Sequence, residues 1–175
     1  HTAYRRQRQM CIRDRSKGLT GGTLPLSAVL TTDAVYAAFY DDDVARGFLH
    51  SHSYTGNPLA CRAALATLEL FEQLDALNAN RALAQRIDAA CASLNQHPRV
   101  RHARRIGMIW AWDVDTPLPD FARRYHQHAM ARGLVLRPIG KTLYAMPPYA
   151  LDEEAVQCLA HGALDALNAT LQEES

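Results

Sequence analysis

Apolar side chains recur every three or four residues along four stretches of the chain, and this spacing predicts helices. The four stretches are residues 58–73, 77–95, 120–132 and 151–172. Asn57 and Pro58 suit the cap and the first position of the first of these helices. Because its apolar residues occupy most sides, we expect this helix to be buried. Gly133 follows the third helix and gives it a C-terminal stop.

Shorter apolar stretches without a helical period predict strands between the helices. These stretches are residues 24–32, 100–105, 106–114, 134–139 and 142–146. The first of them follows a glycine-rich turn and contains β-branched residues, which predicts a buried strand, and residues 33–40 after it predict a short helix. Helices and strands alternate in mixed order without an internal repeat, so the predicted fold class is α/β.

Composition and charge are those of an ordinary globular protein. Of the residues, 48% are hydrophobic and 21% charged, and the net charge is +1. No apolar run approaches the ~20 residues that cross a bilayer and no signal peptide is evident, so we expect a cytoplasmic protein without a membrane partner. The first fifteen residues, HTAYRRQRQMCIRDR, are rich in arginine and lack periodicity, and we expect them to be a non-native or disordered leader.

Cysteines, histidines and clustered arginines give no strong functional signal. We expect reduced and mostly buried thiols, because no CxxC pair occurs among the four cysteines, Cys11, Cys61, Cys91 and Cys158. Two histidine pairs, at 50 and 52 and at 126 and 128, lack the accompanying ligand cluster of a metal site, so we expect no metal. The four arginines between residues 99 and 105 predict a solvated strand face without aromatic residues, and we expect no nucleic-acid partner.

Lys17 is the single charged residue in the stretch SKGLTGGTLPLSAVL. A lone loop lysine is most simply a solvated side chain, beside glycines that supply turn conformations. Alternatively, Gly18, Gly21 and Gly22 leave room for a planar ligand, and an apolar, partly dry surrounding lowers the pKa of the amine. Such an amine is a nucleophile that condenses with aldehydes, and its commonest biological partner is pyridoxal phosphate (PLP).

A candidate phosphate site follows in the stretch HSHSYTGNP, residues 50–58. Its hydroxyl and backbone N–H groups precede a predicted helix start, where the helix dipole favours an anion. Capping explains Asn57 but does not explain the cluster of hydroxyl groups. Lys17 and this stretch together therefore point to a PLP site.

The chain from Ser16 onward resembles the C-terminal part of the class III, fold-type-I PLP aminotransferases. The resemblance is carried by the stretches SKGLTGGTLPLSAVLTT, HSYTGNPLAC and GLVLRPIGKTLYAMPPY. The third stretch is the most discriminating and is similar to the branch of this family that serves biotin synthesis. The resemblance implies amino transfer from S-adenosylmethionine to 8-amino-7-oxononanoate, which gives 7,8-diaminononanoate.

The resemblance also implies roles for residues around the cofactor. Lys17 becomes the Schiff-base lysine that also moves protons, and Gly18 lies beside the substrate. Ser53 and Tyr54 become cofactor-binding residues of a homodimer with shared active sites, in which the Ser53 hydroxyl contacts the phosphate of the cofactor in the partner subunit.

Two further residues are implied in substrate binding. Arg137 becomes the guanidinium that holds a substrate carboxylate, and its planar fork of donors suits that task. Tyr144 corresponds to a tyrosine that lines the substrate pocket in the family, although an aromatic residue in LYAMPPY also suits a core.

The resemblance divides the chain after residue 75. Residues 16–75 are expected to end a large PLP-binding domain, and residues 76–175 to form the small C-terminal α+β domain. The family's ring-binding acid, stacking aromatic residue and phosphate loop precede the lysine, so we expect a truncated portion that is inactive alone. Two alternatives remain: a class III enzyme with an ω-amino acid or ornithine-like donor, and a non-catalytic association fragment.

Overall fold

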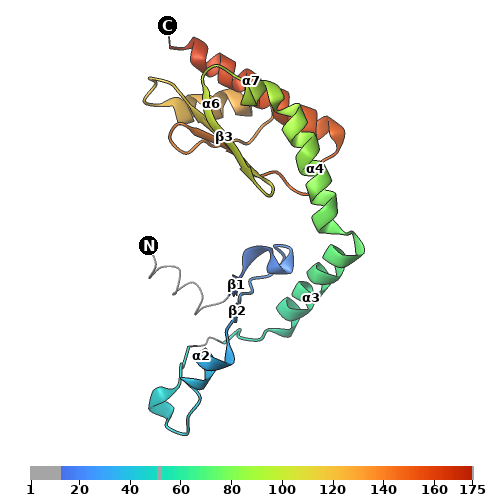
Figure 1. The fold of residues 1–175 in the computed structure, drawn as a ribbon, viewed down its shortest axis with the longest axis vertical. Helices are drawn as coiled ribbons and strands as arrows, with labels where there is room; N and C mark the ends of the chain where they lie inside the picture. The colour runs from blue at the N-terminus through green and yellow to red at the C-terminus, as the bar shows by residue number, and fades with distance from the viewer. Residues whose placement is uncertain (1–12, 51–52, 175) are drawn as a thin grey trace. The chain divides into compact units, whose positions relative to one another are not determined.

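The computed structural model describes residues 13–50 and 53–174. The chain forms two compact units, His1–Ala76 and Leu77–Ser175, which are treated separately below. Figure 1 shows the first unit in blue to green and the second in green to red. None of the described helices is long and apolar enough to cross a membrane.

The first unit contains two short strands and several helical segments. Strand β1 (Arg13–Arg15) pairs antiparallel with β2 (Ala28–Leu30), and Asp14 lies opposite Val29. The helical segments, in order along the chain, are η1 (Lys17–Thr20), α2 (Asp33–Ala37), η2 (Val44–Arg46) and α3 (Pro58–Gln73).

Helix α3 begins and ends as its sequence predicts. The Asn57 side chain accepts a hydrogen bond of 3.0 Å from the Leu59 N–H, and Pro58 occupies the first turn. Ala60 and Ala64 are its buried residues. The helix packs against η1, and a Cβ atom added to Gly21 would lie 3.3 Å from Thr67 Oγ1. Small residues on α3 therefore let the Lys17 turn approach the helix closely.

Two burial expectations for this unit are wrong. The predicted buried strand over residues 24–32 is reduced to Ala28–Leu30, whose side chains are all exposed. Helix α3 was expected to be buried, yet Leu59, Leu65 and Leu68 are 71%, 55% and 54% exposed. The described part of this unit supplies no second layer that covers these apolar side chains. The expectation failed because burial depends on a partner surface, which the apolar pattern alone does not reveal.

The second unit is built around an antiparallel sheet with the strand order β3-β4-β5. Its strands are β3 (Val100–Ile106), β4 (Ile109–Val114) and β5 (Thr142–Ala145). Its helices are α4 (Ala76–Ala90), α5 (Ala92–Asn95), α6 (Phe121–Met130) and α7 (Glu153–Gln172). Gly107, at φ 56°, makes the tight turn between β3 and β4. The helices predicted at 120–132 and 151–172 are confirmed within a few residues, whereas the single helix predicted at 77–95 is divided at Cys91 into α4 and α5.

The core of this unit lies between the sheet and its helices. Alternate residues of β4 point inward, and Trp110 and Trp112 are 2% and 3% exposed. Their indole N–H groups donate 2.7 Å hydrogen bonds to Asp88 Oδ1 and Asn95 Oδ1. These bonds join β4 to α4 and α5 and satisfy both buried donors.

The cysteines are less buried than expected. Cys61 and Cys158 are exposed and Cys91 is buried, whereas Cys11 lies outside the described residues. Burial, reinforced by the charge of Asp88, raises the pKa of the Cys91 thiol to about 11. The prediction of mostly buried thiols is therefore wrong, because exposed positions on α3 and α7 accommodate a cysteine equally well.

Residues 134–139 do not form the predicted strand. Their burial alternates, with Leu134 and Leu136 partly buried and Val135 and Arg137 exposed, as in a strand. However, the one ladder contact in this segment is an isolated bridge between Ile139 and Thr142. The period-two pattern therefore marks an extended segment that packs through its side chains without backbone pairing.

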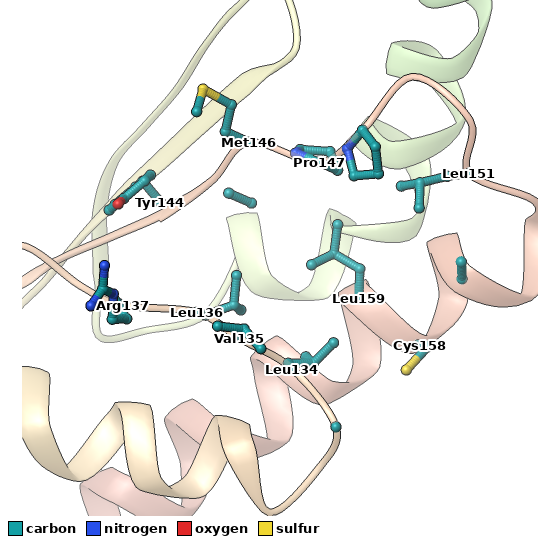
Figure 2. Close-up of a pocket in the computed structure, with 14 residues that line it drawn as sticks. Leu134, Val135, Leu136, Arg137, Tyr144, Met146, Pro147, Leu151, Cys158 and Leu159 are labelled. Carbon is teal, nitrogen blue, oxygen red and sulfur yellow. The ribbon is translucent and has the colours of Figure 1, made fainter. Parts of the chain in front are cut away.

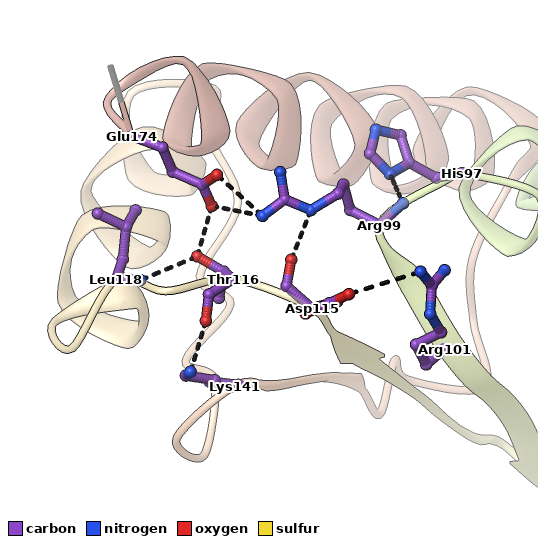
Figure 3. Close-up of polar contacts among 8 residues, drawn as sticks. All are labelled: His97, Arg99, Arg101, Asp115, Thr116, Leu118, Lys141 and Glu174. Atoms are coloured by element: carbon purple, nitrogen blue, oxygen red, sulfur yellow. Dashed lines mark hydrogen bonds and ion pairs between the residues drawn. The ribbon is translucent and has the colours of Figure 1, made fainter.

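The four arginines of the 99–105 stretch are all paired with carboxylates. Their partners are Glu174 for Arg99, Asp115 for Arg101, Asp113 for Arg104 and Asp88 for Arg105. Figure 3 shows the largest of these clusters, in which Glu174 accepts from both Arg99 and the Thr116 hydroxyl. Lys141 Nζ donates to the Thr116 carbonyl in the same cluster. These contacts fasten the end of α7 to the sheet.

Candidate active site

Lys17 opens the short helix η1 with an unusual backbone. Its φ angle is 55°, in the left-handed region, although it is not a glycine. This conformation costs a residue with a side chain about 1–2 kcal/mol. The residue before it, Ser16, is extended, and the helix closes at Gly21, whose N–H donates to Gly18 O at 3.0 Å. Such a strained residue persists only where the surrounding structure holds it.

Thr20 holds the turn that carries Lys17. It is 1% exposed, and its hydroxyl donates a 2.5 Å hydrogen bond to Leu24 O. The Thr23 hydroxyl donates to Thr20 O at 2.7 Å, which fixes the turn from a second side. Together with the packing of η1 on α3, these bonds place the Lys17 backbone.

A hollow of about 770 Å³ brings Lys17 together with the predicted phosphate stretch. Its lining residues come from the Lys17 turn, from the segment before β2 and from the approach to α3: Ser16, Lys17, Leu24, Pro25, Leu26, Ser27, His50, Tyr54, Thr55, Gly56 and Asn57. The volume is within the range of about 300–1,000 Å³ that is usual for small-molecule sites. Two segments about forty residues apart thus line one hollow.

Not every residue named from the sequence lines this hollow. Tyr54 lines it and is 75% exposed, whereas Ser53 and Gly18 are exposed but lie outside the lining. His52 lies outside the described residues. The Leu59 N–H, next to the predicted phosphate stretch, donates to the Asn57 side chain. His50 of the candidate phosphate stretch also lines the hollow, as does Ser27, for which the sequence predicted no role.

The expected dry surrounding of Lys17 is wrong for the described residues. Lys17 is exposed, as is most of the apolar segment that follows it. No hydrogen bond or ion pair joins its amine to any residue that the structure describes. The expectation of a partly dry site rested on a buried strand, whereas the strand that forms, Ala28–Leu30, is exposed.

A second hollow, of about 580 Å³, lies in the second unit and contains Arg137 and Tyr144. Figure 2 shows these two side chains toward one end and Leu151 and Cys158 toward the other. Much of the lining between them is apolar, including Leu134, Leu136, Met146 and Leu159. A cation at one end of an apolar hollow suits a ligand with an anionic group and an aliphatic body.

Arg137 differs from the other arginines of the chain. Every arginine from Arg46 to Arg132 within the described residues donates to a carboxylate, a carbonyl or an amide oxygen. Arg137, the next arginine along the described chain, has no such partner among the described residues. A guanidinium that is exposed in a hollow without a partner is available to an anionic ligand.

Metal ligation has no counterpart in the described residues. No group of three or more histidine, cysteine or carboxylate side chains there is placed to hold a metal ion. His126 and His128 instead contact Leu136 O and Glu173, at 2.8 Å each.

Comparison with known families agrees with this picture of the chain. A family model described as "Aminotransferase class-III" matches residues 10–167. The chain therefore belongs to the class III aminotransferase family, and the fold class inferred from the sequence is confirmed.

Several curated relatives bear the name adenosylmethionine-8-amino-7-oxononanoate aminotransferase. The chain is 38% identical to the Helicobacter pylori protein over 159 residues, which cover 87% of this chain and 36% of the relative. It is 41% identical to the Synechococcus elongatus protein over 161 residues, which cover 87% of this chain and 37% of the relative. The chain thus spans little more than a third of the length of these relatives.

Solved structures agree with the family. The adenosylmethionine-8-amino-7-oxononanoate aminotransferase of Methanocaldococcus jannaschii superimposes with a TM-score of 0.81 at 30% identity, over 89% of this chain and 38% of that one. An omega transaminase from Pseudomonas jessenii gives the same TM-score at 22% identity, over 92% of this chain and 38% of that one, and is similar in fold alone.

Proposed function

We propose that this chain forms part of a PLP-dependent aminotransferase that transfers an amino group from S-adenosylmethionine to 8-amino-7-oxononanoate. The observation that carries the proposal is the hollow of the first unit, where Lys17 meets the stretch before α3. Membership of the class III family and the shared name of the relatives support the substrate assignment.

The residues of the first hollow fit PLP. Lys17 supplies an exposed primary amine, which an aldehyde requires, and the hollow of about 770 Å³ accommodates a small aromatic ring. Ser27, Tyr54 and Thr55, which carry hydroxyl groups, line the same hollow. When bound, the cofactor supplies an electron sink for charge that develops at the substrate carbon. Lys17 would hold it through Nζ, and once the amine of the donor has displaced Nζ, the freed Nζ would remove the proton from the amine-bearing carbon of the donor.

Arg137 would hold the substrate carboxylate. Its guanidinium has no partner among the described residues and can accept a carboxylate in two-point contact. Tyr144 and the apolar lining of the same hollow would contact the aliphatic part of the substrate. Lys17 and Arg137 line different hollows, one in each unit.

Ser53 would act across a dimer. It is exposed and lies outside the hollow of its own chain. The family resemblance assigns its hydroxyl to the phosphate of a cofactor bound by the partner subunit in a homodimer, and the exposure of Ser53 is compatible with that role.

The test is a chimeric enzyme in which residues 16–175 replace the matching part of the Helicobacter pylori relative. Borohydride reduction with PLP should modify Lys17. Lys141, the only other lysine of residues 16–175, is an internal control because its amine donates to Thr116 O at 2.5 Å. Amino transfer from S-adenosylmethionine to 8-amino-7-oxononanoate should follow. Arg137→Ala should raise KM for the acceptor by about ten- to a hundredfold, as expected for a lost charged hydrogen bond.

Two results would contradict the proposal. One is a folded, PLP-binding chimera in which Lys17 stays unmodified. The other is a chimera that transfers amino groups from an ω-amino acid donor but not from S-adenosylmethionine, which would favour a different branch of the family.

A further inference from the structure

We propose that His126 is a positioning residue for Arg137, because its imidazole holds the peptide unit from which Arg137 extends. The inference rests on the proposed function, in which Arg137 binds a substrate carboxylate. The observation behind it is a 2.8 Å contact between His126 Nδ1, on α6, and the Leu136 carbonyl oxygen.

The segment around Arg137 has few other restraints. Leu134 N–H donates to Ala129 O at 2.9 Å, and Ile139 pairs with Thr142. Between these two points, the His126 contact is the only hydrogen bond that residues 135–138 make within the described chain. The backbone near Arg137 is therefore held by one side chain and not by a strand ladder.

The position of this bond matters for the guanidinium. The Leu136 carbonyl and the Arg137 N–H belong to one planar peptide unit, whose atoms extend to the Arg137 Cα. Fixing the carbonyl oxygen therefore fixes the plane from which the Arg137 side chain starts. Figure 2 shows Leu136 and Arg137 on adjoining parts of the hollow's wall.

The chemistry of the contact sets the tautomer. A carbonyl oxygen only accepts hydrogen bonds, so His126 Nδ1 must carry the proton. An asparagine at this position offers an amide N–H close to the place of Nδ1, whereas alanine offers none. His128 is a matched control on the same helix, because it contacts Glu173 and not the Arg137 segment.

The test uses the full 175-residue chain and sodium octanoate as the probe, a straight-chain carboxylate. Binding is followed through the Nε–H signal of Arg137 in nitrogen-15 NMR spectra, which Arg137→Lys identifies by its loss. His126→Ala should weaken octanoate binding about two- to tenfold, the effect of one lost hydrogen bond. His126→Asn should restore wild-type affinity, and His128→Ala should leave it unchanged. Tryptophan fluorescence verifies that each variant is folded, because both tryptophans are buried in this unit.

The outcomes separate this inference from the proposed function. If octanoate leaves the wild-type Arg137 signal unmoved, the carboxylate role of Arg137 fails and the inference fails with it. If Arg137 binds octanoate and His126→Ala binds it equally well, the carboxylate role stands and the positioning role is wrong. A His126→Asn variant as weak as His126→Ala would also overturn the inference, as would nitrogen spectra that show the Nε2-protonated tautomer of His126.

Discussion

Gly162 allows helix α7 to lie against the segment that carries Arg137, and replacing it by alanine should expose how tightly the two are packed. A Cβ atom at this position would lie 2.6 Å from Leu134 Cδ1 and 3.3 Å from Leu134 Cγ. Leu134 is partly buried against the core, so it must move to admit the methyl group. The substitution therefore sets a gain in helix stability against a local clash.

The magnitudes decide the sign. Alanine is favoured over glycine inside a helix by about 1 kcal/mol. Overpacking of a well-packed site costs about 1–3 kcal/mol. We expect Gly162→Ala to lower the free energy of unfolding by about 0–2 kcal/mol in the wild-type chain, as the difference of these terms. In a Leu134→Ala background the clash is absent, and the same substitution should raise stability by about 1 kcal/mol.

The assay is urea unfolding followed by tryptophan fluorescence. The chain has two tryptophans, Trp110 and Trp112, and both lie in the core of the second unit, so the signal reports on that unit. The double-mutant cycle should give a coupling energy of about 1–3 kcal/mol between positions 134 and 162. If Gly162→Ala raises stability equally in both backgrounds, Leu134 turns aside freely and the close approach does not restrain the Arg137 segment.

Thiol accessibility and acid stability provide two more tests. In the native chain Cys61 and Cys158 should react with a thiol reagent and Cys91 should not, because it is buried with its pKa raised to about 11; reaction of native Cys91 at the rate of Cys158 would contradict this. Hydrogen bonds from Thr116 and Arg99 lower the pKa of Glu174, and those from Arg124 and His128 lower the pKa of Glu173. Their contribution to stability should therefore be complete above pH 4.5, the ordinary value for glutamate, and should be lost as the pH falls through the lowered values. The urea midpoint should fall less on acidification in a Glu173→Gln, Glu174→Gln variant, and an identical fall in both proteins would refute the assignment.

Local signals in the sequence predicted helices well. The start of α3 follows from Asn57 and Pro58, which act within one turn of themselves. The start of α7 likewise follows from Asp152, whose side chain accepts from the Ala155 N–H at 2.8 Å. These features depend on neighbouring residues alone, so no knowledge of the fold is needed to read them.

Features that depend on distant partners could not be read in this way. Residues 134–139 have the alternation of a strand, but the pattern does not reveal whether another strand lies beside them. Arg99 pairs with Glu174, 75 residues away, and is therefore not available to an anionic ligand. Arg137 is available because it has no partner among the described residues. Both facts exist only in the folded chain. The same holds for His126, which the sequence offered only as a possible metal ligand.

The two residues proposed to act on the substrate are held in different ways, and each way fits its task. Lys17 has a left-handed backbone that its own turn enforces through Thr20 and the packing against α3, while its side chain is exposed. Arg137 lies on an extended segment whose backbone is fixed near it by the single bond from His126. In both cases the backbone is restrained and the charged end is left without a partner among the described residues. This combination orders the start of each side chain and leaves its charge to a ligand, which is what a covalent lysine and a carboxylate clamp both require.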